Sequence, residues 1–143
     1  MTARVAAMLV LGSLCAGCSG ANLETAPTTP AGTGTETFTS FLAVGGSSVH
    51  GFPVVKAGNI DVTLTVVTPA AVVGLGVGVP NASGGCNLTN SLEASAAIAD
   101  ATTGATTPQL TIPAAVGTYC AEVYDSGQLG GIGRTFTVTI AHP

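Results

Sequence analysis

Residues 114–127 decide the fold of this chain and read Ala-Ala-Val-Gly-Thr-Tyr-Cys-Ala-Glu-Val-Tyr-Asp-Ser-Gly. Tyr119, Ala121 and Val123 share one parity, and alternation with a period of two is typical of a β-strand with one buried face. The closing Asp-Ser-Gly favours a turn. We therefore predict a central strand of a β-sandwich here, with Cys120 at its middle.

The rest of the chain supplies partners for this strand. From residue 38 onward the period stays at two and turn residues recur about every 8–12 positions, which is typical of an all-β sandwich. The other predicted strands cover residues 38–44, 49–55, 60–66, 73–79, 88–101, 109–112 and 134–141. We predict an all-β, jelly-roll or Greek-key-like antiparallel sandwich of about eight strands, with residues 37–143 as one domain.

Two strands have alternation clear enough to assign faces. In residues 60–66 the inward set is predicted to be Ile60, Val62, Leu64 and Val66. Residues 73–79 alternate aliphatic side chains with glycine, which leaves one face bare at Gly74, Gly76 and Gly78. That face is predicted to accept a closely approaching neighbour or a flat ligand. A phosphate loop is not predicted, because its fingerprint needs a helix afterwards and Pro80 begins a turn instead.

Other segments predict where strands end. Residues 45–48 predict a hairpin turn, Pro53 predicts an edge strand or a bulge, and Pro113 predicts the end of a strand. Residues 91–98 also fit two helical turns, since Ala and Glu favour helix. We prefer a strand there because all the neighbouring segments are strands.

The N-terminal part predicts export. Residues 1–17 have one basic residue, an apolar run and small residues, as a signal peptide does. The end of this segment resembles the lipobox of bacterial lipoproteins, which implies lipidation of Cys18 and attachment to a membrane. Residues 18–36 have many turn residues and no hydrophobic period, which predicts a disordered tether. The alternative is an ordinary signal peptide and a soluble secreted or periplasmic protein. We expect an exported, lipid-anchored protein of the bacterial cell envelope.

The composition limits the partners. Charged residues make up 7% of the 143 residues and aromatic residues 4%, whereas soluble domains carry about 25% charged residues. Beyond the leader, two basic side chains stand against seven acidic ones, a net charge of −5. Nucleic acid is not an expected partner, because phosphate binding needs clustered Lys or Arg.

Cys86 and Cys120 are the two cysteines beyond the leader and Cys18. In an exported domain such a pair predicts a structural disulfide, which would stabilise the fold by about 4 kcal/mol through loop closure. No metal or cofactor is predicted, because the folded region has no Cys-x-x-Cys and its two histidines, His50 and His142, lack a ligand spacing.

Candidate catalytic groups are few. A hydrolase would have to use His50, Glu122 or Asp125, yet none of them stands in a motif that joins a base to a nucleophile. The histidines are predicted to cap the core at strand ends, and Asp125 is predicted to bond to backbone amides in a turn. A possible binding surface then remains at Tyr124, Asp125 and Gln128, beside a glycine-rich connection.

Three segments resemble one family. Residues 52–54 read Phe-Pro-Val, residues 57–64 Ala-Gly-Asn-Ile-Asp-Val-Thr-Leu, and residues 115–125 Ala-Val-Gly-Thr-Tyr-Cys-Ala-Glu-Val-Tyr-Asp. They are similar to the bacterial pre-peptidase C-terminal domain, a jelly-roll-like sandwich. The resemblance implies a non-catalytic module of the kind carried by secreted hydrolases. The chain departs from the family in having no attached catalytic domain and no acid clusters for calcium.

These observations favour a non-catalytic exported module that binds a protein or a polysaccharide of the cell envelope. One alternative is a purely structural lipoprotein without a discrete ligand. A hydrolase is a further, weaker alternative, and no catalytic residue is assigned.

Overall fold

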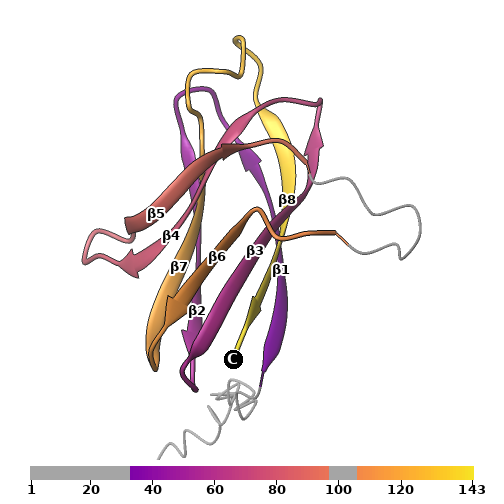
Figure 1. Cartoon of the computed structure of the whole chain (residues 1–143). Coiled ribbons are helices and arrows are strands. Elements are labelled where there is room, and N and C mark those ends of the chain that lie inside the picture. The colour runs from indigo at the N-terminus through magenta and orange to yellow at the C-terminus, as the bar shows by residue number, and fades with distance from the viewer. Residues whose placement is uncertain (1–32, 97–105) are drawn as a thin grey trace, which may run out of the picture.

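The computed structural model describes residues 33–96 and 106–143, which form eight antiparallel β-strands (Figure 1). The predicted signal peptide and Cys18 lie outside these residues. The strands are β1 (Gly34–Leu42), β2 (Ser47–Val54), β3 (Gly58–Thr68), β4 (Val73–Pro80), β5 (Cys86–Ala94), β6 (Leu110–Ala114), β7 (Gly117–Tyr124) and β8 (Arg134–His142).

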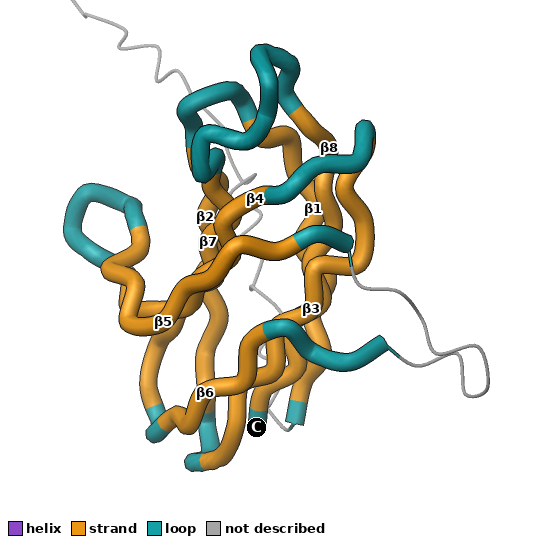
Figure 2. Tube along the Cα trace, turned by 45° about the horizontal axis from the view of Figure 1, so that its top comes forward, coloured by secondary structure: helices purple, strands orange, loops and turns teal. Residues whose placement is uncertain are grey.

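The strands pair as they do in a jelly roll. One sheet has the order β1-β8-β3-β6 and the other the order β2-β7-β4-β5 (Figure 2). β1 pairs with β8, β2 with β7, β3 with β6 and β4 with β5. In this arrangement β1–β4 pair in reverse order with β5–β8, as the two arms of a long hairpin would. The paired strands are divided between two sheets, as in a jelly roll. The predicted all-β sandwich and the central place of residues 117–124 are confirmed.

The predicted hairpin at residues 45–48 is wrong. β1 and β2 lie in different sheets, so their connection crosses between the layers. It turns where the Gly46 amide donates to the Ala43 carbonyl over 3.0 Å, with Gly45 at a φ of 69°. A sequence rich in glycine predicts the turn but not which layer receives the next strand.

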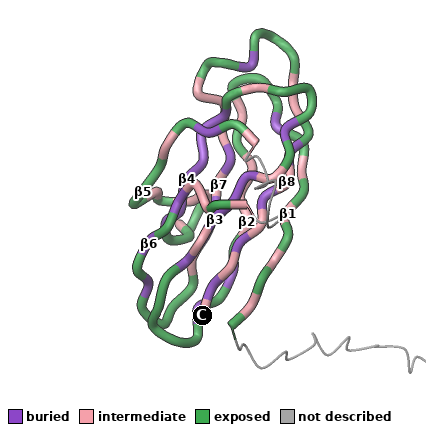
Figure 3. The backbone as a smooth tube through the Cα atoms, turned by 45° about the vertical axis from the view of Figure 1, so that its right-hand side comes forward, coloured by how far each residue is buried: buried purple, intermediate pink, exposed green. Residues whose placement is uncertain are grey.

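The inner faces of the two sheets form one core (Figure 3). Each fully buried aliphatic or aromatic side chain contributes about 1.5–3 kcal/mol relative to an exposed one. The innermost side chains include Phe52, Ile60, Val62, Leu64, Leu75, Val77, Val123, Phe136, Val138 and Ile140. The alternation predicted for residues 134–141 and for the start of β3 is therefore confirmed.

A β-bulge corrects the predicted face of Val66. The register of β3 on β8 shifts between Leu64 and Val66, and the Thr65 hydroxyl donates to the Thr137 carbonyl over 3.1 Å. The extra residue reverses the alternation. Val66 is consequently 44% exposed, whereas Val67 is buried.

The glycines of β4 let the chain cover them closely. A Cβ on Gly74 would overlap the ring of Tyr124, and one on Gly78 would overlap the Asn87 carbonyl. A Cβ on Gly76 would lie 2.8 Å from the side chain of Leu88. The prediction of a close neighbour on this face is confirmed, and the neighbour is the chain itself.

The predicted disulfide joins Cys86 to Cys120, with their Cα atoms 5.9 Å apart. These residues belong to β5 and β7, which lie on either side of β4. The disulfide can pass over β4 because the start of β5 folds closely over Gly78. A side chain at position 78 would block this close approach.

Some predicted boundaries are corrected. The strand β1 begins at Gly34, so residues 34–36 belong to the sandwich rather than to the tether. β6 runs through Pro113 to Ala114; the proline is tolerated because β6 is an edge strand and needs no further ladder bond. Pro53 likewise lies on an edge strand, as predicted. β5 is a strand but ends at Ala94, so the predicted strand does not continue through residues 95–96. The rest of the predicted extension, residues 97–101, lies outside the described residues.

Candidate functional site

Two connections meet at the end of the sandwich opposite the start of β1 (Figure 1). They are residues 43–46, between β1 and β2, and residues 125–133, between β7 and β8. We call this end of the molecule the loop end. It contains the surface that the sequence predicts around Tyr124, Asp125 and Gln128.

Asp125 joins the two connections. Its carboxylate accepts hydrogen bonds from the Gly45 amide at 2.8 Å and the Gly127 amide at 2.7 Å. Its own amide donates to the Gly46 carbonyl at 3.0 Å. The hydrogen bond from Gly45 is the largest influence on the pKa of Asp125, which lies below its ordinary value. The predicted role of Asp125 as a turn residue is confirmed.

Arg134 holds the longer connection from its other side. Its guanidinium donates to the carbonyl oxygens of Leu129 at 2.9 Å and Gly133 at 3.2 Å, and to that of Ile132. The side chain of Leu129 is buried in the core. The side chains of Asp125 and Arg134 therefore both fix the backbone of this connection through hydrogen bonds.

Apolar side chains stand exposed on this fixed surface. Phe41 is 63% exposed, Val44 51% and Ile132 65%. The ring of Phe41 lies against Gly133, where a Cβ would overlap it. The loop end thus presents a firm, apolar surface next to the exposed Gln128.

The three predicted surface residues lie at one end of the structure, but two of them make contacts within the domain instead of facing solvent freely. Tyr124 lies half-buried over Gly74, and Asp125 bonds to backbone amides. Sequence reasoning missed the apolar residues of the loop end. A signal was present, because Phe41 has the outward parity of the threonines in its strand rather than that of Phe38.

A second constellation lies at the corner where the edge strands β1 and β2 approach each other. The carboxylate of Glu36 is 2.7 Å from His50 Nε2 and 3.2 Å from His142 Nε2. The three side chains come from β1, β2 and β8, and so from both sheets. We call these residues the Glu36 cluster.

Aromatic contacts fix the imidazoles. The ring of His50 stacks on Phe38 with centroids 5.0 Å apart, and that of His142 lies 5.2 Å from Phe52. The His142 side chain is 3% exposed and the His50 side chain 30%. The predicted capping of the core by a strand-end histidine is confirmed for His142, whereas His50 lies within β2 rather than at its end.

Glu36 has a shifted pKa. Partial burial raises it, but hydrogen bonds and charge interactions with His50 and His142 outweigh burial, so the pKa lies below its ordinary value. The sequence prediction missed this cluster because it placed Glu36 in the tether. Glu36, His50 and His142 each lie two residues from an inward aromatic or aliphatic residue, and that parity was the available signal.

The candidate hydrolytic residues are not brought together. His50 faces the interior, Glu122 lies between the buried Ala121 and Val123 on the opposite face of β7, and Asp125 is at the loop end. Across residues 33–96 and 106–143, no group of three His, Cys, Asp or Glu side chains is arranged to hold a metal ion.

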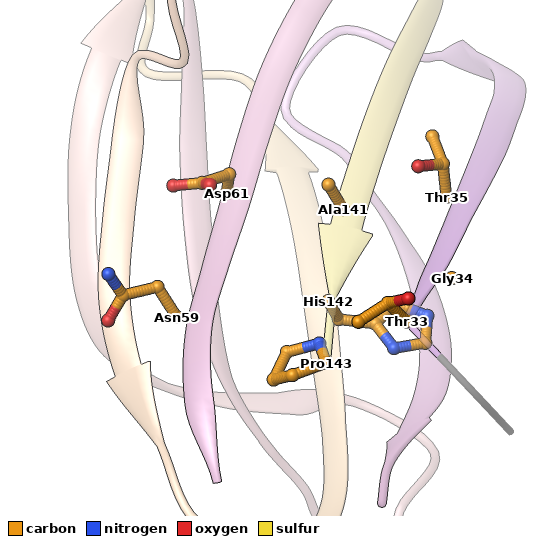
Figure 4. Close-up of a pocket in the computed structure, with 8 residues that line it drawn as sticks. All are labelled: Thr33, Gly34, Thr35, Asn59, Asp61, Ala141, His142 and Pro143. Atoms are coloured by element: carbon orange, nitrogen blue, oxygen red, sulfur yellow. The ribbon is translucent and has the colours of Figure 1, made fainter. Parts of the chain in front are cut away.

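An open pocket of about 350 Å³ lies where β1 and β3 begin and β8 ends (Figure 4). Its lining includes Thr33, Asn59 and Asp61. The Asp61 carboxylate accepts a hydrogen bond from the Thr111 hydroxyl at 2.6 Å. The pocket therefore offers hydroxyl and amide groups and one carboxylate that is already partnered.

No helix within the described part of the chain is long and apolar enough to cross a membrane. Comparison with known proteins found no family model and no curated protein that matches this chain.

Proposed function

We propose that this protein is a non-catalytic, exported module of the bacterial cell envelope that binds a partner protein through its loop end. The observation that carries the proposal is the exposure of Phe41, Val44 and Ile132 on a surface whose backbone is already fixed. A fixed surface loses little conformational entropy on binding, so apolar burial there is converted efficiently into affinity.

A protein is favoured over a polysaccharide. Sugar recognition would use exposed flat rings, but Tyr119 packs against Phe52 with its hydroxyl bonded to the Ala115 amide, and Tyr124 covers Gly74. Branched aliphatic side chains beside a single phenyl ring suit an apolar pocket on another protein. The polysaccharide remains the second candidate.

The orientation of the domain also supports this proposal. β1 begins at the end opposite the loop end (Figure 1). Within the proposal, the chain is anchored through lipidated Cys18 and spaced by a tether, so the loop end faces away from the membrane. The resemblance to pre-peptidase C-terminal domains agrees with a non-catalytic accessory role.

Site-specific photo-crosslinking in intact cells tests the binding proposal. A crosslinker at Ile132 should capture one discrete protein, and a crosslinker at Val116 should not. Val116 is the matched control, because it is 68% exposed and lies at the opposite end, between β6 and β7. Ile132→Ser should weaken capture by a crosslinker placed at Gln128. Equal capture from both ends, or none from Ile132, would contradict the proposal.

The anchor is tested separately by metabolic labelling with a fatty acid. The wild-type chain should take up label and Cys18→Ser should not. Label that persists in Cys18→Ser would remove the anchor from the proposal.

A further inference from the structure

We propose that the Glu36 cluster is an acid-operated latch, which holds the start of β1 and the end of β8 together at neutral pH and releases them in mild acid. The cluster places two imidazoles on one carboxylate, at 2.7 Å for His50 and 3.2 Å for His142. Histidine is the side chain whose charge ordinarily changes between pH 5 and 8.

At neutral pH the latch is closed by hydrogen bonds. Each uncharged imidazole can donate to the carboxylate only if its proton is on Nε2, which leaves Nδ1 as an acceptor. Nδ1 of His142 is buried and has no hydrogen-bond partner. That lone pair is tolerated while the ring is neutral.

A protonated His50 is compatible with the closed cluster. Its side chain is 30% exposed and can keep part of its hydration. The resulting imidazolium pairs with Glu36 and neutralises the only carboxylate in ion-pair distance of either histidine within the described residues.

Protonation of His142 opens the latch. His142 is 3% exposed, and protonation would turn its buried Nδ1 into a donor without an acceptor, a costly arrangement. Within the described residues, no other carboxylate lies in ion-pair distance of His142. Asp61 on β3 is bonded to Thr111, and the neighbouring Phe52 on β2 and Tyr119 on β7 carry no charge. Proton uptake by His142 is therefore coupled to its exposure.

The release is local. Gly34 and His142 are the terminal pair of the β1–β8 ladder, and beyond them the Pro143 carbonyl accepts one backbone bond from Val55 at 3.3 Å. Strand ends open at much lower free energy than a core. The interior of the other sheet, at Val77 and Ala121, stays closed.

Amide hydrogen exchange by NMR at pH 7.5 and pH 5.0, corrected for intrinsic rates, tests the latch on the folded protein. Protection of Glu36 and His142 should be lower at pH 5.0 than at pH 7.5, because acid favours the open form, in which the His142 ring is exposed and can bind a proton. Protection of Val77 and Ala121 should not change.

Two variants separate a latch from a merely structural contact. His142→Gln keeps a donor but cannot take up a proton, so protection at Glu36 should become independent of pH. His50→Gln leaves the Glu36 carboxylate to His142 alone, so protection at Glu36 should fall less between the two pH values than in the wild type.

Equal protection of the wild-type ends at both pH values would overturn the inference, as would the same loss in His142→Gln as in the wild type. If His142→Gln does not fold, the ring protons of His142 are titrated in the unmodified chain. A ring that titrates while the Glu36 amide stays protected would also overturn it.

Discussion

Single residues that should tolerate substitution poorly include the strand glycines covered closely by other parts of the chain. Gly78 lies beneath the Asn87 backbone, Gly74 lies beneath the Tyr124 ring, and Gly51 has only ordinary contact with the Tyr119 carbonyl at 3.8 Å. All three are strand glycines of one sheet. What covers each one decides how it responds to substitution.

Gly78→Ala should destabilise the domain by about 3 kcal/mol, at the upper end of the cost of overpacking, because backbone has to move. Gly74→Ala should cost less, since the Tyr124 side chain can rotate away. Gly51→Ala is the matched control and should be neutral or stabilising by about 0.5 kcal/mol, because alanine lowers the entropy of the unfolded chain. Denaturant unfolding measures all three. An equal loss in Gly51→Ala and Gly78→Ala would contradict the close approach.

Asp125 should make the stability of the loop end depend on pH. Because the folded state lowers its pKa, its stabilising contribution is present above about pH 4, the ordinary value for aspartate, and is lost as pH falls through the lower folded value. Asp125→Ala should speed hydrogen exchange at the Gly45 and Gly127 amides at pH 7. Glu93→Gln removes one negative charge from β5 and should leave both amides unchanged; a matching effect there would point to net charge instead.

At the scale of elements, the β4–β5 hairpin is joined to β7 from outside the core. The disulfide and the fold-over at Gly78 both act at one end of β5. A bulge between Val77 and Gly78 adjusts the register there, with the Thr89 hydroxyl donating to the Val77 carbonyl at 3.1 Å. This end of β5 therefore depends on the covalent bond more than its other end does.

Replacing both cysteines by serine should lower the free energy of unfolding by about 4 kcal/mol, the loop-closure estimate for a loop of this length. The loss of hydrogen-exchange protection should be largest at Asn87 and Leu88, and smaller at Leu92, which packs against the core. Alkylation of the wild-type protein without reductant should modify neither Cys86 nor Cys120. Modification of both would show that Cys86 and Cys120 are not bonded to each other.

In the two sheets that the described residues form, every ladder but one joins strands that are distant in sequence. The exception is β4 with β5. Long-range pairing makes folding slow, because loop-closure entropy is lost before the contacts form. We therefore expect the β4–β5 hairpin to form first during folding.

Val77 of β4 and Val138 of β8 are a matched pair of positions for testing whether the β4–β5 hairpin forms first, since both side chains are fully buried. Val77→Ala should mainly slow folding, and Val138→Ala should mainly speed unfolding, because structure formed early affects the folding rate. Stopped-flow measurements over a range of denaturant concentrations distinguish the two. The reverse pattern would place the nucleus in the β1–β8–β3 sheet.

The architecture could be predicted from sequence because alternation and turn residues are local signals. Eight strands and the covered glycine face follow from them, and the Cys86–Cys120 bond could be predicted because the folded region has one pair of cysteines. The bulge at Thr65 could not, since every residue around it suits a strand and only the partner strand sets the register. The same holds for the Glu36 cluster, whose members meet only once β1, β2 and β8 share a corner. Local alternation predicts a strand's faces only up to a bulge, and pairing with distant strands decides where a bulge lies and which strands are neighbours.

The long β1–β8 ladder also determines how the domain bears a mechanical load. Its nine residue pairs run from Gly34–His142 to Leu42–Arg134. A pull between the loop end and the chain that precedes β1 acts along the strands, so it shears all the pairs together rather than unzipping them one after another. The same domain pulled sideways at one strand end would part pair by pair. The direction in which β1 enters the sandwich thus makes this domain strongest along the axis that joins its loop end to the start of β1.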